Sequence, residues 1–276
     1  MDKDLNIESF LEKHGHYLHV KTVELLRENG WTVLVSPFYR DSATDKAREA
    51  DIIAEKFFPA YSFPPELHGS PEGFVNIRLI IECKYVRDNM VFWFDKKNIG
   101  ATEELIIKNM PIFKPLEENI SIKKHHWCIS DEAAKLFATV NSGAQERQPE
   151  NEMMFSAIDK VLNCLVYYRG QQSIIQKKER KQPILERCGK IIHYPVIVFQ
   201  DFSNLYRVDF SDPKLARRLE NKLYFQTEVN YALTQYVAGG RFNRTEYFLV
   251  DVIPLEVLEK YLNIVSKDVE AISPFV

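Results

Sequence analysis

Residues 75–86, VNIRLIIECKYV, alternate between two sets of side chains, and this stretch constrains the fold more than any other. A repeat of two residues is typical of a β-strand, in which successive side chains point to opposite faces of a sheet. Glu82 and Lys84 therefore project from the same face of a strand that is otherwise mostly apolar. A carboxylate and an ammonium group on a covered strand are unfavourable unless they pair or bind a ligand.

A second acidic stretch, READIIAEK, precedes this strand, and in it Glu49 and Asp51 would share one face. If the two strands are neighbours, Asp51, Glu82 and Lys84 meet at one place. Carboxylate oxygens are ligands that Mg²⁺ prefers, and the ion keeps water and phosphate oxygens in its other positions. The carbonyl of Cys83 would add a neutral oxygen, and Lys84 would favour hydroxide or stabilise the charge that develops on a phosphate.

The simplest alternative is an ion pair between Glu82 and Lys84 on the solvent side of a half-exposed strand. Such a pair contributes almost nothing to stability. This alternative leaves Asp51 and the apolar residues around it without an explanation.

The carboxylates and the lysine also carry a family resemblance. Asp51, thirty intervening residues and then Glu82-Cys83-Lys84 resemble the active-site motif of the PD-(D/E)XK nuclease superfamily. The longer pattern, E-A-D followed by E-C-K, is similar to the Mrr-type restriction and archaeal Holliday-junction-resolvase branches. The resemblance covers mainly residues 16–86.

The resemblance implies an α/β fold with the restriction-endonuclease-like αβββαβ core, in which helices flank a central mixed sheet. Residues 1–276 would form a single domain, with an insertion at 87–150 and additional C-terminal helices. Asp51 and Glu82 would bind Mg²⁺, or Mn²⁺ in its place, and Lys84 would orient or activate water.

Two further carboxylates are accessory candidates. Glu49 would be a second metal ligand. In the families named, the first helix often carries a glutamate ten residues before the glycine that ends it, but here that position is Val20. Glu24, one turn further on, and His19 are the candidate substitutes, and both also fit as surface residues of a core helix.

The segment KKERKQPILERCGK, residues 177–190, holds six basic residues against two acidic ones and is the only such concentration in the chain. It is a candidate nucleic-acid-binding segment, with the candidate phosphate contacts at Lys177, Lys178, Arg180 and Lys181. A solvated run of charges is the alternative.

The whole-chain composition narrows the range of partners. A formal net charge of −3 argues against a protein that coats nucleic acid without specificity, but it is compatible with a nuclease whose basic residues are local. No apolar run reaches the length of a membrane span, and the acidic start MDKDLNIESF lacks the pattern of a signal peptide, so we expect a cytoplasmic protein. A homodimer and a partner protein both stay open.

The four cysteines are far apart and indicate neither a zinc site nor a disulfide framework. The adjacent His125 and His126 are interpreted as polar strand residues, because no third metal ligand stands at helical or strand spacing from them.

The remaining pattern predicts helices and strands in alternation. We expect helices over 5–29, 131–140, 153–168, 212–236 and after Pro254, and strands over 31–38, 126–130, 191–200, 205–210 and 247–253, with 205–210 folding back on 191–200.

The function expected from the sequence is Mg²⁺-dependent hydrolysis of phosphodiester bonds, by an endonuclease that acts on DNA. RNA as the substrate is one alternative. The other is a nuclease-fold binding or effector module that has lost catalysis, although such a module should lack a carboxylate or the lysine, and this chain retains Asp51, Glu82 and Lys84.

Overall fold

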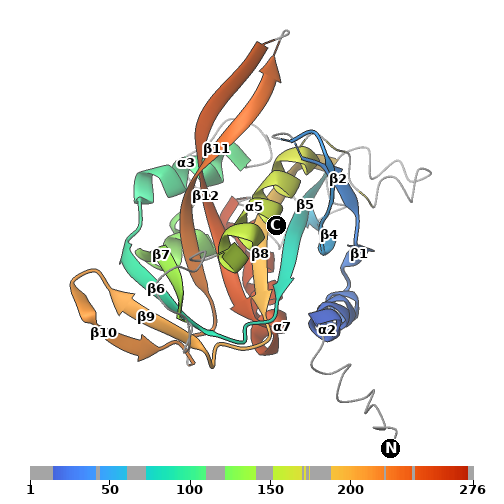
Figure 1. The fold of residues 1–276 in the computed structure, drawn as a ribbon. Helices are drawn as coiled ribbons and strands as arrows, with labels where there is room; N and C mark the ends of the chain where they lie inside the picture. The colour runs from blue at the N-terminus through green and yellow to red at the C-terminus, as the bar shows by residue number, and fades with distance from the viewer. Residues whose placement is uncertain are drawn as a thin grey trace, which may run out of the picture.

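The computed structural model describes residues 15–41, 44–60, 73–109, 122–140, 152–169, 171, 174, 188–220, 222–237 and 240–272. These ranges form an α/β fold around a ten-stranded mixed sheet, beside which lies a two-stranded sheet (Figure 1). The strands are β1 (Thr32–Val35), β2 (Phe38–Arg40), β3 (Ala47–Glu49), β4 (Ile52–Ala60), β5 (Gly73–Lys84), β6 (Asn89–Lys96), β7 (Glu132–Val140), β8 (Cys188–Phe199), β9 (Leu205–Asp209), β10 (Asp212–Arg218), β11 (Phe225–Val237) and β12 (Gly240–Pro254). The helices are α2 (Gly15–Glu28), α3 (Ile99–Asn109), α4 (His126–Ile129), α5 (Glu152–Tyr168) and α7 (Leu258–Ile272), with 3₁₀ turns at Ile122–Lys124 and Leu255–Val257.

The large sheet has the order β1-β4-β5-β8-β12-β11-β7-β6-β9-β10. β1, β4 and β5 are antiparallel neighbours that follow one another across the sheet. β8 then lies parallel to β5, and β12 lies parallel to β8. The helix α5 precedes β8 in the chain and packs against both β5 and β8. β5 and β8 are therefore central strands, which fits their almost continuous apolar sequences.

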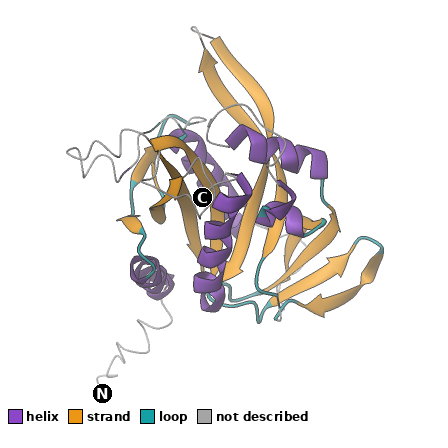
Figure 2. Ribbon diagram, turned by 180° about the vertical axis from the view of Figure 1, so that it is seen from behind, coloured by secondary structure: helices purple, strands orange, loops and turns teal. Residues whose placement is uncertain are grey.

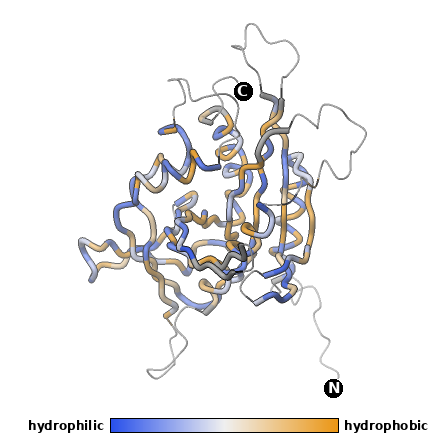
Figure 3. The backbone as a smooth tube through the Cα atoms, turned by 90° about the horizontal axis from the view of Figure 1, so that it is seen from above, coloured by the Kyte–Doolittle hydropathy of each residue, from blue (hydrophilic) through white to orange (hydrophobic). Residues whose placement is uncertain are grey.

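Helices cover both faces of this central part. α5 lies on one face, and α2 and α7 lie together on the other (Figures 1 and 2). Alternation along β5 divides its side chains between two hydrophobic cores: Ile80 packs in the core under α5, whereas Leu79 and Ile81 pack in the core under α2 and α7. The central strands are mostly hydrophobic, and the β9–β10 hairpin is mostly hydrophilic or neutral (Figure 3).

The helix α2 ends where the sequence indicates. Gly30 has a φ of 76°, the left-handed conformation that commonly closes a helix and that glycine adopts without strain. Trp31 follows as a buried residue, and β1 begins directly after it. Residues 5–14 of the expected helix lie outside the described residues.

The prediction of a helix over 212–236 is wrong. These residues form β10 and β11, and β11 pairs with β12 along its whole length in a hairpin that projects from the body of the molecule (Figure 1). Every second residue from Phe225 to Leu233 is apolar or threonine, a strand pattern that the helix interpretation overlooked. The basic residues Arg217 and Arg218 therefore lie on the exposed strand β10.

Two predictions between 126 and 140 are also wrong. Residues 132–140, EAAKLFATV, favour a helix locally but form β7, which pairs with β6 from Lys96 to Asn89. This long-range pairing outweighs the helix propensity of alanine, lysine and leucine. The expected strand at 126–130 is instead the short helix α4, in which the backbone N–H of Trp127 donates to the side chain of the N-cap residue His125.

The expected insertion at 87–150 contributes β6 and β7 to the ten-stranded sheet. The prediction that 205–210 folds back on 191–200 is wrong: β9 pairs with β6 and β10. β8 cannot accept it as a neighbour, because β5 and β12 already occupy both of its edges.

Candidate active site

Glu82 lies near the end of β5 on the face that α5 covers, and its side chain is 1% exposed. It shares this face with Ile80 because alternate residues of a strand point the same way. Lys84, two residues on, is also on this face, and its Nζ donates to Glu82 Oε1 at 2.7 Å. The two residues of the sequence motif therefore form a largely buried ion pair.

Asp51 lies beside Glu82, directly before the neighbouring strand β4. The register pairs Ile52 with Ile81, so Asp51, one residue before β4, is level with Glu82. The backbone N–H of Cys83 donates to Asp51 Oδ2 at 2.8 Å, which holds the carboxylate against the end of β5. The structure thus brings Asp51, Glu82 and Lys84 together.

A second lysine, which the sequence pattern does not indicate, completes the cluster. Lys160 of α5 donates from Nζ to the same Glu82 Oε1 at 2.8 Å, so two ammonium groups meet at one carboxylate oxygen. The sequence places Lys160 on the side of its helix opposite the apolar stripe, which favours a solvent position. Its contact with Glu82 spans 78 residues, and no local pattern in the chain indicates it.

Burial and charge act in opposite directions on this cluster. Burial raises the pKa of Glu82, the Asp51 carboxylate raises it further, and the two lysines act to lower it. Burial alone would lower the pKa of Lys160, but its hydrogen bond to Glu82 and the negative charges of Glu82, Asp51 and Glu49 raise it instead. Neighbouring carboxylates that repel each other while holding cations are typical of a site for a divalent metal or for proton transfer.

The accessory candidates are placed differently. Glu49 ends β3 and is exposed, and it contributes negative charge at Lys160. It belongs to the small β2–β3 sheet, whereas Asp51 directly precedes β4, which corrects the expectation that both share one strand. Glu24 is exposed on α2 and pairs with Lys21 at 2.8 Å. His19 is partly buried on the same helix.

The cysteines do not form a metal site in the described part of the chain. The Cys83 thiol points towards α2, where its Sγ lies 3.7 Å from Thr22 Oγ1, and burial raises its pKa. Cys83, Cys128 and Cys164 are unpaired. The basic residues Lys177, Lys178, Arg180 and Lys181 lie outside the described residues.

A buried ion pair beneath α5 fixes the position of this helix. Arg78 and Glu55 are both 0% exposed, and Arg78 donates from Nε to Glu55 Oε1 at 2.6 Å. The same guanidinium donates from Nη1 to the carbonyl of Tyr168 at 2.6 Å, which ties the end of α5 to β5. This contact holds the helix that carries Lys160 against the strand that carries Glu82.

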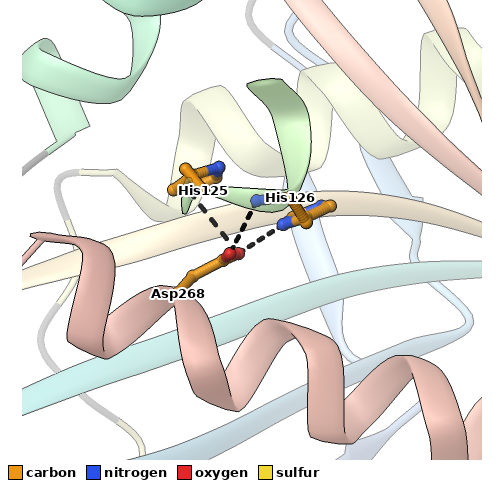
Figure 4. A group of neighbouring side chains, drawn as sticks. All are labelled: His125, His126 and Asp268. Atoms are coloured by element: carbon orange, nitrogen blue, oxygen red, sulfur yellow. Dashed lines mark hydrogen bonds and ion pairs between the residues drawn. The ribbon is translucent and has the colours of Figure 1, made fainter. Parts of the chain in front are cut away.

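A second polar cluster lies in the other core, between α4, β12 and α7 (Figure 4). His126 is flanked by two buried carboxylates: Asp268 contacts Nδ1, and Asp251 Oδ2 lies 3.0 Å from Nε2. The backbone N–H of His126 also donates to Asp268 Oδ1 at 2.8 Å. The interpretation of His125 and His126 as polar strand residues is wrong, because His126 begins the helix α4 and His125 caps it. Their partner Asp268 lies on α7, 142 residues from His126 in the sequence.

His125, His126 and Asp268 have ligand atoms within 4.8 Å of one another, as a metal site requires. Their hydrogen bonds indicate that protons, and not a metal ion, occupy the ring nitrogens of the two histidines. Burial lowers the pKa of His126, but the charges of Asp268 and Asp251 outweigh it and raise the pKa to about 10, so both ring nitrogens carry hydrogen. His125 Nδ1 accepts from the Trp127 N–H at 3.2 Å, which leaves the ring proton on Nε2, 3.0 Å from the Tyr194 hydroxyl. Neither ring offers a lone pair to a metal there, and the cluster is better explained as a buried ionic link.

Comparison with family models, with curated proteins and with solved structures gives no match for this chain. Among the helices of the described ranges, none combines the length and the apolar character that crossing a membrane requires.

Proposed function

We propose that this protein is a metal-dependent nuclease that hydrolyses phosphodiester bonds in nucleic acid, with DNA as the favoured substrate. The observation that carries the proposal is the convergence of Asp51, Glu82 and Lys84 at the end of β5, with Lys160 bound to the same Glu82 oxygen as Lys84. A surface ion pair would not bury Glu82 beside a second carboxylate. The sequence motif and its spatial arrangement thus support the same chemistry.

We infer that the core is restriction-endonuclease-like. When the small β2–β3 sheet and the segment from β6 to β7 are left out, the order is α2, β1, β4, β5, α5, β8, and it supports this inference. It gives three antiparallel neighbours, then a helix, then a strand parallel to β5. Asp51 and Glu82, the carboxylates of the motif, lie where the second and third strands of this order meet.

The residues at this site fit a small divalent cation. Asp51 and Glu82 offer hard carboxylate oxygens, and two carboxylates completed by water and phosphate oxygens are a common arrangement for Mg²⁺. The lysine ammonium groups that meet at Glu82 Oε1 act as stand-in cations at the same carboxylate. When bound, Mg²⁺ or Mn²⁺ would polarise the phosphate and lower the pKa of a bound water.

The chain's own residues have separate tasks in this proposal. Asp51 and Glu82 hold the cation, and the Cys83 N–H fixes the orientation of the Asp51 carboxylate. Lys84 is 18% exposed, so its ammonium group is screened from bulk solvent and can act on the attacking water and on the negative charge that develops at phosphorus.

Wild-type protein is expected to cleave nucleic acid in the presence of Mg²⁺ or Mn²⁺ and to be inactive with a chelator. The assay compares plasmid DNA, single-stranded DNA and RNA, which separates the DNA proposal from its RNA alternative. Glu82→Gln protein purified in parallel controls for contaminating nucleases. If the wild-type protein binds nucleic acid but cleaves none of these substrates with either metal, the alternative of a non-catalytic binding module is favoured.

The basic segment is proposed to contact phosphates. Replacing Lys177, Lys178, Arg180 and Lys181 with alanine should weaken nucleic-acid binding and flatten its dependence on salt. Each lost phosphate contact lowers the slope of log affinity against log salt by about 0.9 for duplex DNA. Fluorescence anisotropy over a range of salt concentrations measures this slope, and an unchanged affinity and slope would assign the segment to the solvated surface.

A further inference from the structure

Glu82 Oε1 accepts hydrogen bonds from two ammonium groups, and this double contact has a consequence for metal binding. A divalent cation bound to Glu82 would lie close to both lysines. Because like charges repel strongly at such short distances, both ammonium groups cannot stay in place beside the metal. One of the two lysines has to move when the metal binds.

Lys160 is the lysine that is free to move. Lys84 extends from β5 only two residues after Glu82, so the strand fixes the Cα of Lys84 beside the carboxylate. The Lys84 side chain is 18% exposed. Lys160 reaches Glu82 from the facing helix α5 and is 32% exposed. A lysine side chain has four flexible carbons, so its ammonium group can leave Glu82 and stay near the site.

The charges of the site show where a released ammonium group would go. Glu49, Asp51 and Glu82 give three negative charges in the neighbourhood of Lys160, against the two positive charges of Lys84 and Lys160. A divalent metal turns this excess of one negative charge into an excess of one positive charge, and a phosphodiester restores neutrality. Lys160 released from Glu82 is then a cation next to an anionic substrate, with the exposed Glu49 as the remaining carboxylate nearby.

We propose that Lys160 couples metal binding to substrate binding. It neutralises Glu82 in the free protein and competes with the metal for that carboxylate; when the metal binds, it transfers to a substrate phosphate. This inference rests on the proposed nuclease function. Because coupling between two ligands is reciprocal, nucleic acid should tighten metal binding by the same factor by which the metal tightens nucleic-acid binding.

The test measures metal affinity, not cleavage alone. Calcium binding is followed by calorimetry with and without a short duplex DNA, after subtraction of calcium binding to the DNA. For the wild-type protein, DNA should lower the calcium Kd about fivefold or more, within the usual range for coupled sites. Lys160→Met should bind calcium about fivefold more tightly than wild type without DNA, since it lacks the competing cation. The further tightening by DNA should be smaller than in wild type, because only the phosphate oxygens that bind the metal directly still contribute to it.

Lys267→Met is the matched control, because it removes the same charge from an exposed position on α7. It should behave like wild type in both titrations. Equal calcium affinities for wild type and Lys160→Met, or a wild-type affinity that DNA leaves unchanged, would overturn the role of Lys160 while an active wild-type nuclease still upholds the proposed function. A wild-type protein that binds no metal and cleaves nothing would overturn both.

Discussion

Lys84→Ala is expected to lower the single-turnover rate of phosphodiester cleavage by about 10²–10³-fold, the usual effect of removing a preorganised charge that acts on a transition state. Metal affinity should not weaken, because Lys84 is not a ligand and its ammonium group lies at Glu82 Oε1, where it competes with a cation. Rapid-quench cleavage and calorimetric metal titration of the same preparation measure both quantities.

Asp51→Ala provides the contrast, because it removes one of two anionic metal ligands. We expect this variant to lose both cleavage and tight metal binding. The Cys83 N–H also loses its acceptor at 2.8 Å, so the fold of the variant should be checked by its unfolding free energy. If Lys84→Ala cleaves at the wild-type rate, Asp51, Glu82 and Lys84 are neighbours only because their strands pair, and they have no catalytic role. The alternative of a binding module would then be preferred.

The parts of this site that the sequence predicts are those set by neighbouring residues. Alternation along residues 75–86 places Glu82 and Lys84 on one face of β5. The position of Asp51 beside Glu82 requires only that the strand after Asp51 pairs with the next strand of the sheet as an antiparallel neighbour. This is the commonest arrangement for strands close in sequence. Lys160 could not be predicted, because its role depends on how α5 lies across the sheet.

The incorrect predictions have two physical causes. The alternation of β11, which pairs with β12 in a local hairpin, is a strand pattern that the helix interpretation overlooked. β7 has a helix-favouring composition, but its pairing with the distant strand β6 outweighs that local propensity. The His126 cluster is similar. Its partners Asp251 and Asp268 come from β12 and α7, and neither stands at a spacing that would connect it to His126 in the sequence.

This buried cluster predicts a pH dependence of stability that is independent of the nuclease proposal. The pKa of His126 is raised from 6.5 to about 10 in the folded protein, so the folded state holds a proton that the unfolded state releases. A group whose pKa is raised on folding contributes its full stability below the unfolded pKa, and this contribution is lost as the pH rises towards the folded pKa. The stabilising effect of His126 is therefore complete below pH 6.5 and is lost between pH 6.5 and about 10.

The range from pH 6.5 to 8 isolates this effect. Burial lowers the pKa of Lys97, near Asp251, from 10.5 to about 8. The folded protein therefore loses the Lys97 proton before the unfolded protein does, which raises the free energy of unfolding with pH, but only above pH 8. Burial lowers the pKa of His125 to about 4, so His125 raises the free energy of unfolding with increasing pH, but only below pH 6.5. Between these limits the free energy of unfolding should fall by about 1.4 kcal/mol per pH unit because of His126, or up to about 2 kcal/mol in all.

His126→Gln should remove this slope and destabilise the protein by about 3–5 kcal/mol at pH 6.5, because it leaves two buried carboxylates without their shared cation. His125→Gln is the matched control: the neighbouring ring is equally buried but neutral, so the slope between pH 6.5 and 8 should persist. Urea denaturation at a series of pH values, with and without a chelator, measures both variants against wild type.

The chelator distinguishes a proton from a metal as the cation between these side chains. A metal held by His125, His126 and Asp268 would bind more tightly as the pH rises, since its ligands must lose their protons, and stability would then increase towards pH 8. A proton on His126 gives the opposite slope and no response to chelator. Wild-type stability that rises with pH and falls on chelation would therefore identify a metal centre and refute the buried imidazolium.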